Sequence, residues 1–172
     1  MHLALVGMMG SGKTTVGTRV AEALQWPFLD SDRMIEAREG RTVREIWLAD
    51  GEPAYRDLET KVLEDALALP DPAVVAAAGG VVLREENRRL LKRAHVCTVR
   101  LVADPEVLVT RVGQQGHRPL LDDDPLTALR RLATEREELY REVADATVQT
   151  GHAPIEAVAD DVLRALAACE AP

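Results

Sequence analysis

The feature that most constrains the fold of this chain is "GMMGSGKTT", residues 7–15, which matches the pattern G-x-x-x-x-G-K-[ST]. It follows the short apolar run "HLALV" and precedes a helical pattern over about residues 13–24. Glycines after a buried strand allow backbone N–H groups to converge on an oxyanion, and the helix N-terminus adds partial positive charge. The stretch therefore predicts a strand, a phosphate-binding loop and a helix, in that order.

The residue types in this loop predict how it would bind a nucleotide. Lys13 can reach the β- and γ-phosphates, and the Thr14 hydroxyl is a ligand for Mg²⁺. The other nucleotide-binding candidates in the loop are Gly10, Ser11, Gly12 and Thr15. We therefore expect a nucleotide to bind here together with Mg²⁺.

Two aspartates separated by one residue end the next apolar run, "WPFLDSD" at residues 26–32. Side chains two apart on an extended segment point the same way, so Asp30 and Asp32 would face one side. Ligands of open α/β sheets bind beyond the carboxyl ends of the strands, which places both aspartates beside the phosphate loop. One carboxylate would support Mg²⁺, and the other would face a hydroxyl that accepts a phosphoryl group. The alternative is that both are helix caps or turn residues.

Apolar runs alternate with helical patterns along the rest of the chain, which predicts a parallel α/β sheet. "TVRE" at residues 42–45 has the spacing of a capping box and predicts the start of a short helix. Asp104 precedes Pro105 and is interpreted as a helix cap rather than as a metal ligand. The remaining strands are expected at about residues 27–30, 73–80, 95–102 and 146–150, and the remaining helices at about 31–38, 52–69, 126–143 and 154–168.

Residues 113–125, "GQQGHRPLLDDDP", contain glycines, two prolines and three adjacent aspartates, so we expect a mobile connection there. No internal repeat or low-complexity linker divides the sequence. We therefore expect residues 1–172 to form a single domain.

The charge balance and the cysteines narrow the class of protein further. A formal net charge of −8 argues against a general binder of nucleic acid or of a membrane surface. No apolar run approaches the roughly 20 residues that span a bilayer. Cys97 and Cys169 form no CxxC pair, so we expect a buried Cys97, no disulfide and a reducing, cytoplasmic location.

Several motifs together resemble those of the shikimate kinase family, and the resemblance covers nearly the whole chain. "IWLADGEPAYRDLE" at residues 46–59 is similar to the family's D-G-E-x-x-F-R-x-x-E, with Tyr55 in the aromatic place. The other motifs are "LDSD" after the phosphate loop, "HRPLL", "EREELYREVA" and a proline after the last strand. The resemblance implies ATP-dependent phosphorylation of the 3-hydroxyl of shikimate, a step towards chorismate and the aromatic amino acids.

The resemblance also implies a fold. It is a three-layer α/β/α P-loop kinase with a five-stranded parallel sheet in the strand order 2-3-1-4-5. A substrate-binding region would lie around residues 31–61, and a lid around residues 112–124. Family members are often monomers, so a monomer that acts on two small molecules is expected.

The resemblance assigns roles to individual residues. Asp30 corresponds to the aspartate that supports Mg²⁺, and Asp32 to the one that binds the shikimate hydroxyls and takes the proton. Arg56 and Arg136 correspond to the two arginines that hold the substrate carboxylate, a role that suits a planar guanidinium. Gly79 and Gly80 correspond to the backbone donors beside the substrate ring. Arg118 corresponds to the lid residue at the transferred phosphate, and Arg111 and Pro154 to the neighbours of the adenine.

Two points leave the interpretation open. On residue pattern alone, Arg136 is a surface charge in a helix rich in arginine. The family usually has three consecutive glycines where this chain has Ala78 and two glycines, and Ala78 would strain the site if that position required positive φ. The alternatives are a kinase for gluconate or a nucleoside monophosphate, and a nucleotide-binding protein that lacks catalysis.

Overall fold

A computed structural model describes residues 1–112 and 124–171, which contain one five-stranded parallel sheet. Its strand order is β2-β3-β1-β4-β5, as the resemblance implies. The central strand pairs Leu3 with Val74 on one side and with Cys97 on the other. The strands are β1 (His2–Val6), β2 (Phe28–Asp30), β3 (Val74–Ala76), β4 (Val96–Val102) and β5 (Ala146–Gln149).

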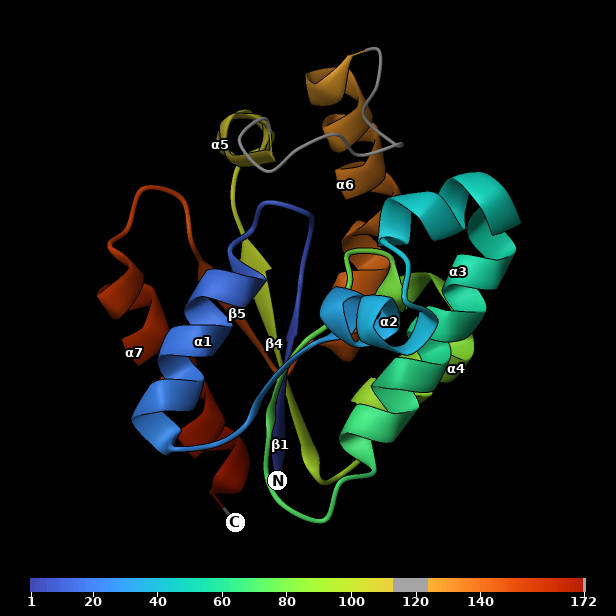
Figure 1. Ribbon diagram of the computed structural model, residues 1–172. Helices are drawn as coiled ribbons and strands as arrows, with labels where there is room; N and C mark the ends of the chain where they lie inside the picture. The colour runs from blue at the N-terminus through green and yellow to red at the C-terminus, as the bar shows by residue number, and fades with distance from the viewer. Residues whose placement is uncertain (113–123, 172) are drawn as a thin grey trace.

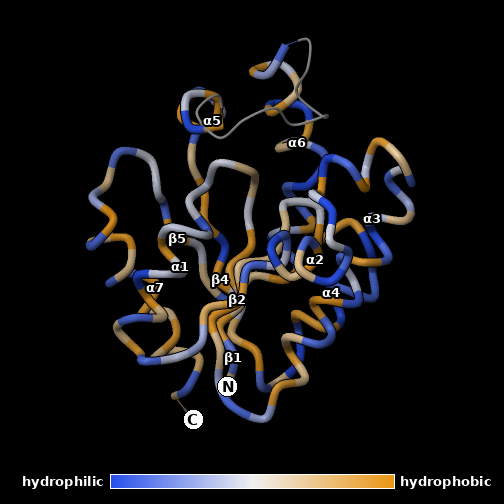
Figure 2. Tube along the Cα trace, in the orientation of Figure 1, coloured by the Kyte–Doolittle hydropathy of each residue, from blue (hydrophilic) through white to orange (hydrophobic). Residues whose placement is uncertain are grey.

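The sheet is covered on both faces, which explains why its central strands are apolar without alternation. Leu3 and Leu5 of β1 belong to the apolar core on one face, and Ala4 and Val6 belong to the core on the other. Parallel strands joined by helical crossovers are normally buried in this way. Figure 2 shows hydrophobic colour along the strands at the centre of the molecule.

Helices form the two outer layers, and Figure 1 shows them on opposite sides of the sheet. The first layer contains α1 (Lys13–Leu24) and α7 (Ile155–Glu170), which contact each other. The opposite layer contains α3 (Val43–Leu67), α4 (Glu85–Leu91) and α6 (Pro125–Val143). Two further helices, α2 (Ser31–Glu39) and α5 (Pro105–Val112), follow β2 and β4, and the 3₁₀ turn η1 (Val81–Leu83) precedes α4. None of the helices in the described ranges combines the length and the apolar character that crossing a membrane requires.

The start of α3 confirms the predicted capping box. The Glu45 N–H donates to Thr42 Oγ1 at 3.2 Å, and the Thr42 N–H donates to Glu45 Oε2 at 2.7 Å. Gly51 has a φ of 85°, so α3 is kinked between its first part and the segment that begins near Pro53. The two helices expected here are therefore both present, as two segments of α3 joined at Gly51. The seven-residue helix α4 was not expected, because so short a segment shows little periodicity.

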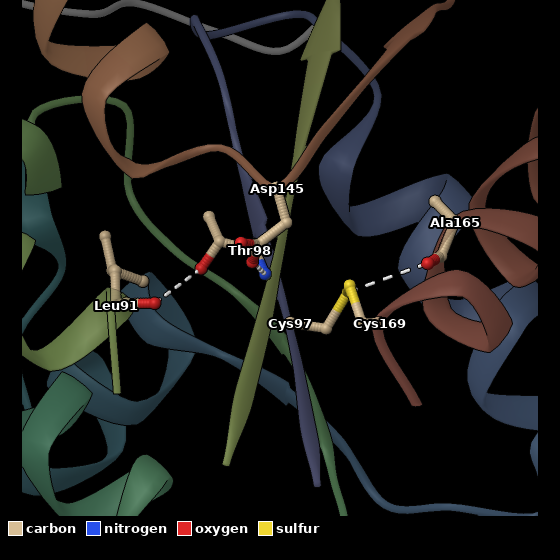
Figure 3. Close-up of a disulfide and its surroundings, with 6 residues drawn as sticks. All are labelled: Leu91, Cys97, Thr98, Asp145, Ala165 and Cys169. Carbon is tan, nitrogen blue, oxygen red and sulfur yellow. Dashed lines mark hydrogen bonds between the residues drawn. A yellow bond between two sulfur atoms is a disulfide. The ribbon is translucent and has the colours of Figure 1, made fainter. Parts of the chain in front are cut away.

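The expectation of no disulfide is wrong, because the structure joins Cys97 Sγ to Cys169 Sγ (Figure 3). Cys97 is the second residue of β4 and is fully buried, as expected, and Cys169 lies in the last turn of α7. The Cα atoms are 5.9 Å apart, which is a normal separation for a disulfide. The two residues are 72 positions apart, so a search for closely spaced cysteines could not pair them.

Candidate active site

The phosphate loop lies between β1 and α1 and has the backbone conformation that its glycines predict. Gly7 has a φ of +144°, and a Cβ atom there would lie 2.3 Å from the Leu101 carbonyl oxygen. No residue with a side chain fits that position. Lys13 Nζ donates to the carbonyl oxygens of Gly7 and Met8, at 2.9 Å each, so this amine lies over the loop.

Asp30 contacts the phosphate loop and also caps a helix, so its interpretation as a helix cap is confirmed and its role toward Mg²⁺ stays a prediction. Its Oδ2 accepts a hydrogen bond from Thr14 Oγ1 at 2.8 Å. Its Oδ1 accepts the N–H groups of Asp32 and Arg33, at 3.1 and 3.3 Å, and thereby begins α2. The carboxylate and the hydroxyl present two hard oxygen ligands side by side, a donor set that suits Mg²⁺.

Asp32 does not lie on an extended segment as the sequence predicted, although it lines the same cavity as Asp30. Strand β2 ends at Asp30, and Asp32 lies in the first turn of α2 rather than on an extended segment. Both carboxylates nevertheless line the same small cavity as Lys13 and Thr14. Asp32 Oδ1 accepts a hydrogen bond of 2.9 Å from the Tyr55 hydroxyl.

Arg56 is held in the wall of a larger cleft by two carboxylates of its own helix. Only 6% of the residue is exposed. Its Nη1 donates to both oxygens of Glu59, at 2.9 and 3.1 Å, and its Nε and Nη2 donate to Glu52 Oε1. A Cβ atom at position 80 would lie 2.0 Å from Nη1, so this packing requires Gly80.

Arg136 is buried, which corrects the interpretation of it as a surface charge. It is 3% exposed and its Nη1 donates to the Gly79 carbonyl oxygen at 2.9 Å. The hydroxyl of Tyr140 donates to the same oxygen at 2.5 Å, and burial raises the pKa of Tyr140 to about 12. The Arg136 Nε is buried and has no hydrogen-bond partner among the residues that the structure describes. The Gly79 carbonyl therefore accepts two hydrogen bonds, and the donor role that the resemblance assigns to the Gly79 backbone N–H stays a prediction.

These groups surround one cleft of about 570 Å³. Residues of the phosphate loop and of β2 line one side, and residues of α2, α3 and α6 line the other. The cleft therefore presents a phosphate-binding end and a cationic end, with Asp32 among its lining residues. The side chains that line it include Thr14, Asp30, Asp32, Tyr55, Arg56 and Arg136, with Gly79 and Gly80 also in the wall.

Glu59 is an ionisable group that sequence reasoning did not single out. It is 1% exposed, and burial is the main reason why its pKa is raised to about 7, a shift that the nearby Asp32 charge increases and the Arg56 partner opposes. The native state therefore binds this proton more tightly than the unfolded chain does. Its contribution to stability falls as the pH rises from about 4.5 to about 7.

A second cavity of about 430 Å³ lies on the other side of the phosphate loop, lined by Gly10, Ser11, Gly12 and Thr15. Arg111 also lines it, and its guanidinium donates to the carbonyl oxygens of Gly10, Thr150 and Gly151. Arg111 therefore lies beside the phosphate loop, and its role as a neighbour of the adenine stays a prediction. Pro154 is exposed and does not line this cavity, although Ala153 and Ile155 do.

Three remaining expectations have different outcomes. Arg118 and most of the lid around residues 112–124 fall in residues 113–123, outside the described ranges, so both stay predictions. Ala78 does not have positive φ, so the strain considered for it is absent. Asp104 does not line the cavity of the two aspartates, and its carbonyl oxygen accepts the first hydrogen bonds of α5.

Comparison with known proteins agrees with this geometry. A family model described as shikimate kinase matches residues 9–167. The shikimate kinases of Nitrosococcus oceani and Symbiobacterium thermophilum are each 43% identical to the chain, and each alignment covers 96% of the chain. The alignments cover 86% of the Nitrosococcus protein and 96% of the Symbiobacterium protein. A solved structure described as shikimate kinase from Acinetobacter baumannii in complex with shikimate has a TM-score of 0.93 and 36% identity, covering 99% of this chain and 95% of that one. The chain that carries this phosphate loop and these two buried arginines therefore belongs to the shikimate kinase family.

Proposed function

We propose that this protein transfers the γ-phosphoryl group of MgATP to the 3-hydroxyl of shikimate, giving shikimate 3-phosphate and ADP. The observation that carries the proposal is the cleft that joins the phosphate loop to Arg56 and Arg136. A small hydroxy acid needs a cationic site for its carboxylate and a carboxylate near its hydroxyl, and both line this cleft.

The substrate carboxylate would bind between Arg56 and Arg136. Arg56 donates to Glu59, and Arg136 donates to the Gly79 carbonyl oxygen. These hydrogen bonds orient both guanidinium groups before the substrate binds. The unpartnered Arg136 Nε supports this assignment, because a buried N–H without an acceptor is costly and a carboxylate oxygen would satisfy it.

The hydroxyl that accepts the phosphoryl group would face Asp32. This carboxylate lines the same cavity as Lys13 and Thr14, so a hydroxyl bound to it lies beside the phosphate loop. In that position Asp32 orients the nucleophile and accepts its proton during transfer. Lys13 would contact the β- and γ-phosphates.

Thr14 and Asp30 would hold Mg²⁺, Asp30 either directly or through water. When bound, the ion neutralises charge on the phosphates. Gly10, Ser11, Gly12, Thr15, Arg111 and Pro154 would bind the nucleotide, and Arg118 would approach the transferred phosphate. We further propose a cytoplasmic monomer that acts on small molecules and binds neither nucleic acid nor membranes, which the net charge of −8 supports.

The first test is ADP release from MgATP in the presence of shikimate, compared with gluconate, AMP, CMP and no acceptor. We expect fast release with shikimate alone. Fast release with another acceptor would contradict the proposed substrate, and ATP binding without turnover on any acceptor would favour a binding protein.

A variant of the carboxylate site makes this test specific. Arg136→Lys keeps the positive charge but loses the planar pair of donors, so we expect the KM for shikimate to rise by about tenfold or more. The KM for MgATP should stay within about twofold. Arg141→Lys is the matched control, because Arg141 lies on the same helix and is exposed. Equal effects of the two substitutions would contradict the assignment of Arg136.

A further inference from the structure

We infer that Tyr55 is a positioning residue for catalysis, which holds the Asp32 carboxylate in the orientation that phosphoryl transfer needs. The inference rests on the proposed function, because it assigns Tyr55 a role through Asp32. The family pattern D-G-E-x-x-F-R-x-x-E has phenylalanine at this place, and a phenylalanine cannot make the contact described here.

The contact is a single hydrogen bond between two helices. The Tyr55 hydroxyl of α3 donates to Asp32 Oδ1 in the first turn of α2, at 2.9 Å. Both residues line the cleft that contains Arg56 and Arg136. The bond therefore connects the carboxylate that faces the acceptor hydroxyl to the helix that carries part of the carboxylate-binding site.

The Tyr55 ring is fixed, so its hydroxyl is a rigid donor. The residue is 5% exposed, its ring centre lies 5.4 Å from that of Trp47, and the Arg56 guanidinium carbon lies 5.2 Å from the Tyr55 ring centre. Burial, followed by the charges of Asp32 and Glu59, raises the pKa of Tyr55. The hydroxyl is therefore protonated at neutral pH, where it can donate to Asp32.

A donor in this position limits the rotation of the Asp32 carboxylate. A carboxylate with one oxygen held by a buried hydroxyl loses that bond if it turns, and hydrogen bonds to charged groups are among the stronger ones in proteins. Phosphoryl transfer depends on the alignment of the attacking oxygen, so a carboxylate that turns more freely lowers the rate of the chemical step.

The test is Tyr55→Phe, which removes the hydroxyl oxygen and leaves the ring to pack against Trp47. We expect kcat with shikimate to fall by about tenfold and the affinity for shikimate to fall several-fold, while the KM for MgATP stays within about twofold. An unchanged melting temperature would show that the ring still packs. An unchanged kcat and shikimate affinity would overturn the role of Tyr55.

A double-mutant cycle separates this role from packing. Shikimate affinity is measured by calorimetry in the wild type, Tyr55→Phe, Asp32→Ala and the double variant, so that the comparison does not depend on a residual rate. If Tyr55 acts through Asp32, the Tyr55→Phe change has no further effect in the Asp32→Ala background. The same loss in both backgrounds would show a direct or structural role and would overturn the inference.

The wild-type reaction distinguishes the failure of this inference from the failure of the proposed function. A wild-type protein that does not phosphorylate shikimate overturns the proposed function, and the role of Tyr55 with it. A wild-type protein that does, together with a Tyr55→Phe variant of equal kcat and equal affinity, overturns the role of Tyr55 alone.

Discussion

The disulfide between β4 and α7 gives a prediction whose magnitude follows from the position of its two cysteines. Cys97 and Cys169 are 72 positions apart, so their bond restricts the unfolded chain by closing a long loop. The chain-entropy relation gives a loss of about 15 cal/mol/K for such a loop, or about 4.4 kcal/mol at 25 °C. For a chain of this size, that free energy corresponds to a difference in melting temperature of roughly 9–18 °C.

The assay compares oxidised and reduced protein. The purified protein is treated with oxidised glutathione or with a reductant, its free thiols are counted under denaturing conditions, and its thermal unfolding is recorded. The Cys169→Ser variant is the control, because position 169 is only partly buried and the change leaves Cys97 in the core. Its melting temperature should match that of the reduced wild type and should not respond to reductant.

Two results would refute this reasoning. Oxidised protein without free thiols that melts within about 2 °C of the reduced protein would contradict the chain-entropy account of the stabilisation. Two free thiols after oxidation would show that the bond does not form in solution. In a reducing cytoplasm the same pair would be a dithiol, so the stability measured with reductant is the value relevant to that compartment.

Two further predictions concern the substrate site. Gly80→Ala places a Cβ atom 2.0 Å from Arg56 Nη1, which must displace the guanidinium. We expect steady-state kinetics to show a KM for shikimate raised by about tenfold or more and an unchanged KM for MgATP. A normal KM for shikimate would contradict the packing described. We expect Glu59 to take up a proton when shikimate binds at pH 7–8. The pKa of Glu59 is already raised to about 7, and the shikimate carboxylate would raise it further by adding negative charge nearby and by competing with Glu59 for Arg56. Calorimetry in two buffers of different ionisation enthalpy measures this uptake, and a Glu59→Gln variant that takes up the same number of protons would contradict the assignment.

The local parts of this structure could be predicted from the sequence. The phosphate loop and the capping box depend on glycines, a hydroxyl and a carboxylate at fixed short spacings, so the sequence shows them directly. The three inner strands, β1, β3 and β4, could be found for a related reason, since parallel strands buried on both faces are short apolar runs. The two segments of α3 could also be predicted, because the helical patterns before and after Gly51 are separate in the sequence as they are in the structure.

The parts that depend on distant contacts could not be predicted from residue patterns. The burial of Arg136 depends on the carbonyl of Gly79, and the pairing of Cys97 with Cys169 depends on how α7 packs on β4. Only the family resemblance placed Arg136 at the site. No pattern in the sequence predicted the raised pKa of Glu59, because desolvation depends on the whole surrounding fold.

The two sets of hydrogen bonds made by Asp30 link the phosphate loop to α2. One oxygen of this side chain is bonded to the phosphate loop and the other to the first turn of the helix that bears Asp32. The short side chain of Asp30 therefore connects the phosphate loop directly to the start of α2. A longer or more flexible residue at position 30 would weaken this connection and let α2 move relative to the phosphate loop.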